Sequence, residues 1–199
     1  MVSWDIKMPC ETSACEDAIA ALAANLRIRE LLQGGSISCS TSSRSNSSKN
    51  ASSTPPSRTD AMRVTCRPCS SEGPEGGARA VLMDSSPLEI VLCTNRLSVK
   101  EIEDVVVHEL VHVYDHTNKR CDLSTCEGLA YSEVRAAREA ECNRFFPFLW
   151  LKTECVRHHA TRSTANLFPA DAAKCVAASM DKAMADDEPF SHRGRSWKK

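Results

Sequence analysis

One short pattern constrains this chain more than any other, the H-E-x-x-H sequence of residues 108–112. On a helix, residues four apart lie one above the other on the same face, so His108 and His112 can bind one zinc ion together. Glu109 lies beside them and is placed to take a proton from a water that the metal activates. The pattern therefore predicts a zinc site with a general base, provided that it lies on a helix.

The residues before and after the pattern predict that helix. Ser98 and Glu101 have the S-x-x-E spacing of a capping box, which starts a helix. An apolar flank follows, and a helix this apolar is expected to be buried. The alternative, histidines satisfied by ordinary core hydrogen bonds, suits one histidine better than two histidines and a glutamate together. The apolar flank consists of Ile102, Val105, Val106 and Val113.

A catalytic zinc ion takes three protein ligands and leaves one position for water. The sequence offers Asp115, His116 and Glu133 as the third ligand. An unbroken helix rises about 1.5 Å per residue, which carries Asp115 and His116 a turn or more beyond the metal. Glu133 lies on the next predicted helix, which can fold back over the first. We therefore predict His108, His112 and Glu133 as metal ligands, with a surface ion pair to a nearby arginine as the alternative for Glu133.

In this interpretation Glu109 abstracts a proton from the attacking water and later delivers it to the departing amine. Asp115 is expected to orient one of the ligand histidines. Four side chains are candidates to stabilise the oxyanion, and the sequence does not choose among Tyr114, His116, His158 and His159.

The charge balance excludes an electrostatic attraction to nucleic acid. Lysine and arginine number 25 against 26 aspartates and glutamates, a formal net charge of -1. A basic tail over residues 191–199 is the local exception. We expect this tail to be solvated, with a weak contact to anionic lipid as the alternative.

Eleven cysteines in 199 residues indicate disulfides and an oxidising compartment. The odd count leaves at least one cysteine unpaired. The first residues lack the basic and apolar regions of a secretory signal, and their acidic side chains disfavour a matrix transit peptide. No stretch reaches the roughly 18 apolar residues of a spanning helix, so we expect a soluble or peripheral protein.

Four helical patterns and a polar segment precede or follow the motif. Residues 13–32 read as one helix with a Ser13 and Glu16 capping box, and residues 36–59 as a disordered Ser-rich insertion. A second box at Ser124 and Glu127 predicts a helix ending at Phe146. Two further helices are expected over residues 151–165 and 171–184.

Two short strands are expected just before the motif, over residues 80–83 and 88–93. The edge strand of such a sheet can bind a peptide in extended form. Cys66 and Cys69 form a C-x-x-C pair, for which half a zinc ribbon, a redox pair or two separate disulfides are possible, and we favour the last. Further expected pairs are Cys121 with Cys126, and Cys155 with Cys175.

The motif residues 108–116, residues 90–95 before them and residues 132–137 after them together resemble the family of mitochondrial inner membrane metalloproteases that mature ATP synthase subunit 6. The similarity runs from about Cys66 to Phe190 and includes residues 155–157 and Cys175. Tyr131 and Thr117 stand where the family has cysteines.

The resemblance implies an α+β, zincin-like metallopeptidase fold, mostly helical with a small sheet beside the H-E-x-x-H helix and stapled by disulfides. It implies a zinc-dependent endopeptidase, peripheral on the intermembrane-space side of the inner membrane, which cleaves the subunit 6 precursor and assists ATP synthase assembly. The alternatives are an assembly chaperone of the same family with an idle metal site, and a structural zinc module on Cys66 and Cys69. The expected division is a helical segment (1–35), the Ser-rich insertion (36–59), the peptidase domain (60–190) and the basic tail (191–199).

Overall fold

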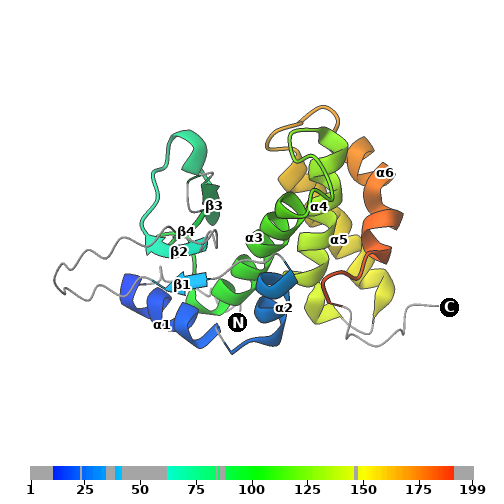
Figure 1. Ribbon diagram of the computed structural model, residues 1–199. Coiled ribbons are helices and arrows are strands. Elements are labelled where there is room, and N and C mark those ends of the chain that lie inside the picture. The colour runs from blue at the N-terminus through cyan, green and yellow to red at the C-terminus, as the bar shows by residue number, and fades with distance from the viewer. Residues whose placement is uncertain are drawn as a thin grey trace, which may run out of the picture. The chain divides into compact units, whose positions relative to one another are not determined.

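The computed structural model describes residues 11–22, 24–34, 39–41, 62–83, 85, 88–145 and 148–190 (Figure 1). The chain forms two compact units. Unit 1 comprises residues 1–23 and 36–102, and unit 2 comprises residues 24–35 and 103–199. The described residues are mostly helical with one small sheet, as predicted. The expected domain boundaries near residues 35, 59 and 190 meet undescribed residues and stay a prediction.

Unit 1 combines helix α1 (Thr12–Leu22) with a small sheet. Its strands are β1 (Cys39–Thr41), β2 (Met62–Arg67), β3 (Ala80–Met83) and β4 (Glu89–Cys93), in the order β1-β2-β4-β3. The neighbours β1 and β2, and β2 and β4, run parallel, whereas β3 runs antiparallel to β4. Both predicted strands are confirmed, and β4 lies inside the sheet because four consecutive residues, Ile90 to Cys93, are apolar and buried.

Two cysteine pairs of unit 1 lie at disulfide distance. The sulfur atoms of Cys15 and Cys66 are 2.07 Å apart and connect α1 to β2. Those of Cys69 and Cys93 are 2.00 Å apart and connect the residues after β2 to the end of β4. The favoured interpretation of the C-x-x-C sequence is confirmed, since its two cysteines pair with different partners.

The prediction of one helix over residues 13–32 is wrong. The structure has α1 and a separate helix α2 (Leu26–Gly34). The two helices are separate because the side-chain oxygen of Asn25 accepts a hydrogen bond from the backbone N–H of Arg27, 3.0 Å away, as a capping residue at the start of a helix does. The predicted disordered insertion lies outside the described residues except for residues 39–41, which form β1.

The predicted start of the motif helix is confirmed. The backbone N–H of Ser98 donates to the Glu101 carboxylate over 3.1 Å, and the Ser98 hydroxyl donates to the same oxygen over 2.8 Å. A short 3-10 turn (Val99–Glu101) leads into helix α3 (Ile102–Thr117). Ile102 is buried, so the turn fixes where the apolar flank of α3 begins.

Unit 2 is a helical assembly around α4 (Cys126–Glu139). Helices α5 (Leu149–Thr164) and α6 (Ala172–Ala185) pack against α4 and against each other (Figure 1). Every residue of α4 from Leu129 onward is buried. The core between these helices contains Val134, Val156 and Val176. Among the described residues, no helix has both the length and the apolar character needed to cross a membrane.

The ends of α4 differ from the prediction. Its N-cap is Thr125, whose hydroxyl accepts from the N–H of Gly128 over 3.1 Å, because Ser124 instead donates to the Asp122 carboxylate over 2.6 Å. The helix ends at Glu139 rather than Phe146, and a 3-10 turn (Asn143–Phe145) follows. Helices α5 and α6 match the two further predicted helices to within two residues at each end.

Both predicted cysteine pairs of this region are wrong. Cys126 lies at disulfide distance from Cys175, which joins the start of α4 to α6. Cys142 lies at disulfide distance from Cys155, which joins the residues after α4 to α5. Cys121 is left as a free thiol. Helix α4 packs against both partner helices, and this tertiary arrangement decides the pairing.

Candidate metal centre

Helix α3 holds the two motif histidines side by side. The ring centroids of His108 and His112 are 4.8 Å apart, and the ring planes meet at 77°. This is the arrangement expected for residues four apart on a helix. Glu109, the predicted general base, follows His108 on the same helix and is partly buried.

Helix α4 brings Glu133 to these histidines. One Glu133 carboxylate oxygen lies 3.3 Å from Nε2 of His108, and the other lies 3.6 Å from Nε2 of His112. The ligand atoms of the three residues all lie within 4.8 Å of one another. Two ligands about 2.1 Å from one tetrahedral ion are themselves about 3.4 Å apart, so these separations suit a shared Zn²⁺ ion.

The Oε2 atom of Glu133 supports this fit. It is buried and has no hydrogen-bond partner among the described residues, although Nε2 of His108 is only 3.3 Å away. A buried carboxylate oxygen without a partner is costly unless a cation occupies the position toward which it points. Two imidazoles and one carboxylate form a ligand set that zinc hydrolases use.

Each histidine binds a second group through its other ring nitrogen. Nδ1 of His108 lies 3.3 Å from the Glu141 carboxylate, and Nδ1 of His112 lies 2.7 Å from the Ser132 hydroxyl. Such contacts fix the ring orientation and leave Nε2 free to bind a metal. The sequence prediction missed both Ser132 and Glu141.

The Ser132 hydroxyl connects His112 to Asp115. Ser132 donates its proton to the Asp115 carboxylate over 2.8 Å, so its oxygen accepts from the Nδ1–H of His112. Nε2 of a neutral His112 then carries a lone pair and faces a carboxylate oxygen of Glu133. Two hydrogen-bond acceptors that face each other in a buried site define a position for a cation.

The two histidines have opposite pKa shifts. Burial and the neighbouring His108 lower the pKa of His112 to about 4, against the opposing effect of Glu133. Burial also acts to lower the pKa of His108, but the Glu133 and Glu141 carboxylates outweigh it and raise that pKa well above its ordinary value. Burial acts to raise the pKa of Glu133, whereas the two histidines lower it on balance. The carboxylates around His108 therefore favour positive charge at this position.

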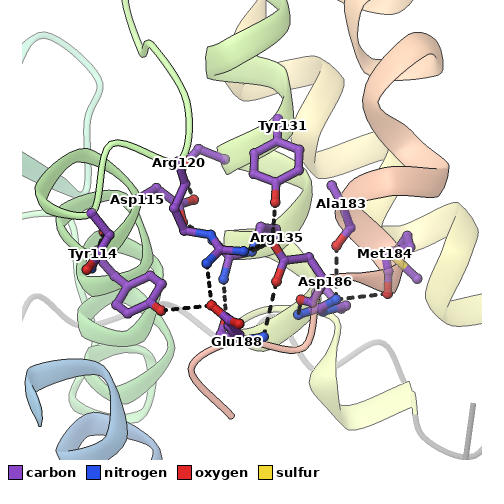
Figure 2. A network of polar contacts seen from close by, with 12 residues as sticks. Tyr114, Asp115, Arg120, Tyr131, Arg135, Ala183, Met184, Asp186 and Glu188 are labelled. Carbon is purple, nitrogen blue, oxygen red and sulfur yellow. Dashed lines mark hydrogen bonds and ion pairs between the residues drawn. The ribbon is translucent and has the colours of Figure 1, made fainter. Parts of the chain in front are cut away.

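The arrangement continues behind His112 into the interior of unit 2. Asp115 forms an ion pair with Arg135, and both side chains are buried. Arg135 in turn donates to the backbone carbonyl of Glu188, as Figure 2 shows. The segment after α6 is thereby joined to the helix that supplies Glu133.

Several side chains hold this segment in place (Figure 2). Arg138 donates to the carbonyl oxygens of Ala183 and Asp186 over 3.0 Å and 2.7 Å. Tyr131 donates its hydroxyl to the Asp186 carboxylate, which also pairs with Arg120. These contacts hold α4 in place through side chains other than its candidate metal ligand, Glu133.

The other candidate residues have different positions. Asp115 contacts Ser132 and Arg135 rather than the two histidines, so it reaches His112 only through Ser132. His116 is exposed. Tyr114 lies in the network of Figure 2, 3.5 Å from the Glu188 carboxylate. His158 and His159 stack edge to face on α5. A second cluster of Cys142, Cys155 and His159 offers no metal site, because its two cysteines are paired.

A helix with H-E-x-x-H and a glutamate from the next helix is the arrangement of a candidate metallopeptidase centre. The profile of the peptidase M76 family matches residues 38–191 of the chain. The chain therefore belongs to the peptidase M76 family, and the expected family resemblance is confirmed.

Several proteins of similar sequence are named as mitochondrial inner membrane proteases. The mitochondrial inner membrane protease atp23 of Sclerotinia sclerotiorum is 32% identical over 148 residues, covering 66% of this chain and 60% of that protein. The human mitochondrial inner membrane protease ATP23 homolog is 37% identical over 120 residues, covering 54% and 49%. The mitochondrial inner membrane protease ATP23 of Scheffersomyces stipitis is 43% identical over 58 residues, covering 28% of this chain and 24% of that protein. The chain thus matches between about a quarter and three fifths of the length of these relatives, and no solved structure matches it.

Proposed function

We propose that this protein is a zinc-dependent endopeptidase. The observation that carries the proposal is the buried position between Nε2 of His112 and Glu133, where two acceptors face each other beside Nε2 of His108. Such a position favours a cation, and the ligand set suits Zn²⁺. Membership of a peptidase family supports the hydrolytic role.

The roles of the residues follow from their contacts. His108, His112 and Glu133 would hold the ion, which when bound supplies a Lewis acid that polarises water and the scissile carbonyl. Glu109 takes the proton of the attacking water and returns it to the departing amine nitrogen. Ser132 and Glu141 hold the two imidazole rings in orientation through their Nδ1 atoms.

The substrate and location come from the relatives and from the family resemblance. The relatives are named mitochondrial inner membrane proteases, which supports a protein substrate at that membrane. The resemblance extends this to the ATP synthase subunit 6 precursor as substrate. It also supports a peripheral position on the intermembrane-space side, and a part in ATP synthase assembly.

The first test measures zinc content in the oxidised protein and in His112→Ala and Glu133→Gln variants. We expect about one zinc ion per wild-type chain and weaker retention in both variants. Glu127→Gln is the matched control, because Glu127 is an exposed glutamate at the start of the same helix as Glu133. Unchanged zinc retention in Glu133→Gln would assign the third ligand elsewhere, and a wild-type protein without zinc would overturn the proposal.

The second test separates peptide cleavage from metal binding. Glu109→Gln removes the base while retaining the size of the side chain, so we expect normal zinc content and a loss of cleavage of at least about 100-fold. If this variant still supports ATP synthase assembly, the assembly role is independent of cleavage, as the chaperone alternative requires. Full cleavage by Glu109→Gln would contradict the proposed base.

A further inference from the structure

The chain is apolar and exposed where it enters α5. We call residues 148–150, the last residue before α5 and its first two residues, the tip. Phe148, Leu149 and Trp150 have exposed fractions of 61%, 49% and 69%. Single exposed apolar side chains are ordinary on protein surfaces, but three consecutive ones with two aromatic rings mark an interaction site. None of the three belongs to the candidate metal centre.

Backbone hydrogen bonds connect the tip to residues on both sides of it. The Cys142 and Cys155 pair closes the segment that contains it, over a sequence separation of 13. The N–H of Phe148 donates to the carbonyl of Phe145 over 2.7 Å, and the N–H of Lys152 donates to that of Phe148 over 3.0 Å. The large apolar side chains are therefore presented to solvent at the start of α5.

The charged residue that the chain carries just before the tip is basic. Arg144 is the only charged residue between Cys142 and Lys152, and it is exposed. Its guanidinium lies 5.5 Å from the centre of the Phe145 ring, so its stem covers an aromatic surface while its charge faces water. The first turn of α5 has no acidic residue. Exposed apolar side chains beside an arginine complement a surface in which an anionic layer covers an apolar one.

We propose that the tip, together with Arg144, attaches the protein to the lipid and water interface of an anionic bilayer. Tryptophan and phenylalanine favour this interface, and arginine reaches the lipid phosphates beside them. The tip itself has no charged side chain with which to select a protein partner, which favours lipid as the occupant. The proposal rests on the proposed position of the protein at the inner membrane.

This attachment has a consequence for the candidate metal centre. Glu141, which contacts Nδ1 of His108, directly precedes Cys142 of the closed segment. The membrane contact and the support of a ligand histidine thus belong to one short connection. Attachment through the tip would hold the metal centre close to the bilayer surface, where a segment of a membrane protein emerges into water.

The first experiment measures binding of the full oxidised chain to phosphatidylcholine vesicles with and without phosphatidylglycerol, by flotation. We expect Phe148→Ser combined with Trp150→Ser to weaken the partition coefficient about tenfold or more, and Arg144→Gln to weaken it only on the anionic vesicles. Leu167→Ser is the matched control, because Leu167 is 68% exposed just beyond the other end of α5 and should leave binding unchanged. Equal binding by wild type and the double tip variant would overturn the proposal.

The second experiment observes the tip directly. The chain has three tryptophans, so Trp4→Phe with Trp197→Phe leaves Trp150 as the only one. On addition of anionic vesicles we expect a blue shift of its emission and quenching by brominated lipid. Unchanged emission together with vesicle binding would place the contact elsewhere and overturn the proposal.

The outcomes are separable from those of the proposed peptidase. The double tip variant should cleave a soluble peptide as well as wild type does, while Glu109→Gln should bind vesicles normally. If the double tip variant binds vesicles normally but has a raised KM for peptide, the tip contacts a protein substrate instead of lipid, which contradicts the proposal. Failure of peptide cleavage by wild type would leave the vesicle result unaffected.

Discussion

Asp115 and Arg135 form an ion pair in the interior of unit 2, with side chains that are 0% and 1% exposed. The pair joins α3 to α4, the two helices that supply the candidate ligands. Asp115 also accepts from Ser132, whose oxygen holds His112. The pair therefore sets the relative position of the two helices at the level of the candidate metal centre.

Removing one member of this pair should be costly. Arg135→Met leaves the Asp115 charge buried without its partner, and we expect a loss of about 3–5 kcal/mol in the free energy of unfolding. Denaturant unfolding of the oxidised, zinc-free protein measures this. Asp115→Leu combined with Arg135→Met removes both charges and should be more stable than Arg135→Met alone. If the losses of unfolding free energy in Arg135→Met and in Asp115→Leu simply add up to the loss in the double variant, the coupling of the two residues is contradicted.

Ser132→Ala tests the support of His112. The change removes the acceptor of its Nδ1–H, so the ring loses its fixed orientation, and we expect zinc affinity to fall by about 10–100-fold. Competition with a chelator measures the affinity. Ser179→Ala is the control, since Ser179 is also a buried serine but donates to the Glu127 carbonyl instead. An affinity unchanged in Ser132→Ala would show that the hydroxyl does not position the ring.

Local patterns were sufficient for the part of the site that lies on single helices. The capping box at Ser98, the apolar flank of α3 and the spacing of its histidines are all set by residues close in sequence. Glu133 was predicted because the next helix can fold back over α3, and the structure places it within 3.6 Å of both Nε2 atoms.

Contacts between helices could not be predicted in the same way. Glu133 was given a surface ion pair with a nearby arginine as its alternative, but Arg135 and Arg138 are buried and contact α6 or the segment after it. The burial of α4 also decides that Cys126 pairs with Cys175 rather than with Cys121. No spacing rule in the sequence contains this information, because it depends on the packing of helices far apart in the chain.

The cysteine pairs make a separate prediction. Peptide mapping of the oxidised protein should recover Cys126 with Cys175 and Cys142 with Cys155. Cys175→Ser should lower the free energy of unfolding by about 2–5 kcal/mol, because the pair closes a long loop in the unfolded chain. Cys121→Ser is the control and should change it little. A recovered Cys121 with Cys126 peptide would contradict the assignment.

Cys121 should be a slow nucleophile. Burial raises the pKa of its thiol to about 11, although Arg120 and Lys182 oppose the shift. The thiolate fraction at pH 8 is then on the order of 1 in 1,000, and the rate of alkylation should rise about tenfold per pH unit up to the pKa. Iodoacetamide labelling in a Cys10→Ser and Cys39→Ser background measures this, with the protein unfolded in guanidinium as the fast control. Equal rates in the folded and unfolded protein would contradict it.

Gly128→Ala places two effects in opposition at the start of α4. Helix propensity alone favours alanine over glycine by about 1 kcal/mol. A Cβ at this position would lie 2.0 Å from the carbonyl oxygen of Asp122 and 2.8 Å from Oγ1 of Thr125, the N-cap. Because the nearest obstacle is backbone, it cannot rotate away, and the turn that caps the helix must move.

We therefore expect Gly128→Ala to destabilise the protein by about 1–3 kcal/mol in denaturant unfolding, against its propensity. Ala173→Gly on the exposed face of α6 measures the propensity effect alone and should cost up to about 1 kcal/mol. A Gly128→Ala variant more stable than wild type would mean that the Asp122 carbonyl moves without cost. In that case the capping turn does not fix the start of the helix that carries Glu133.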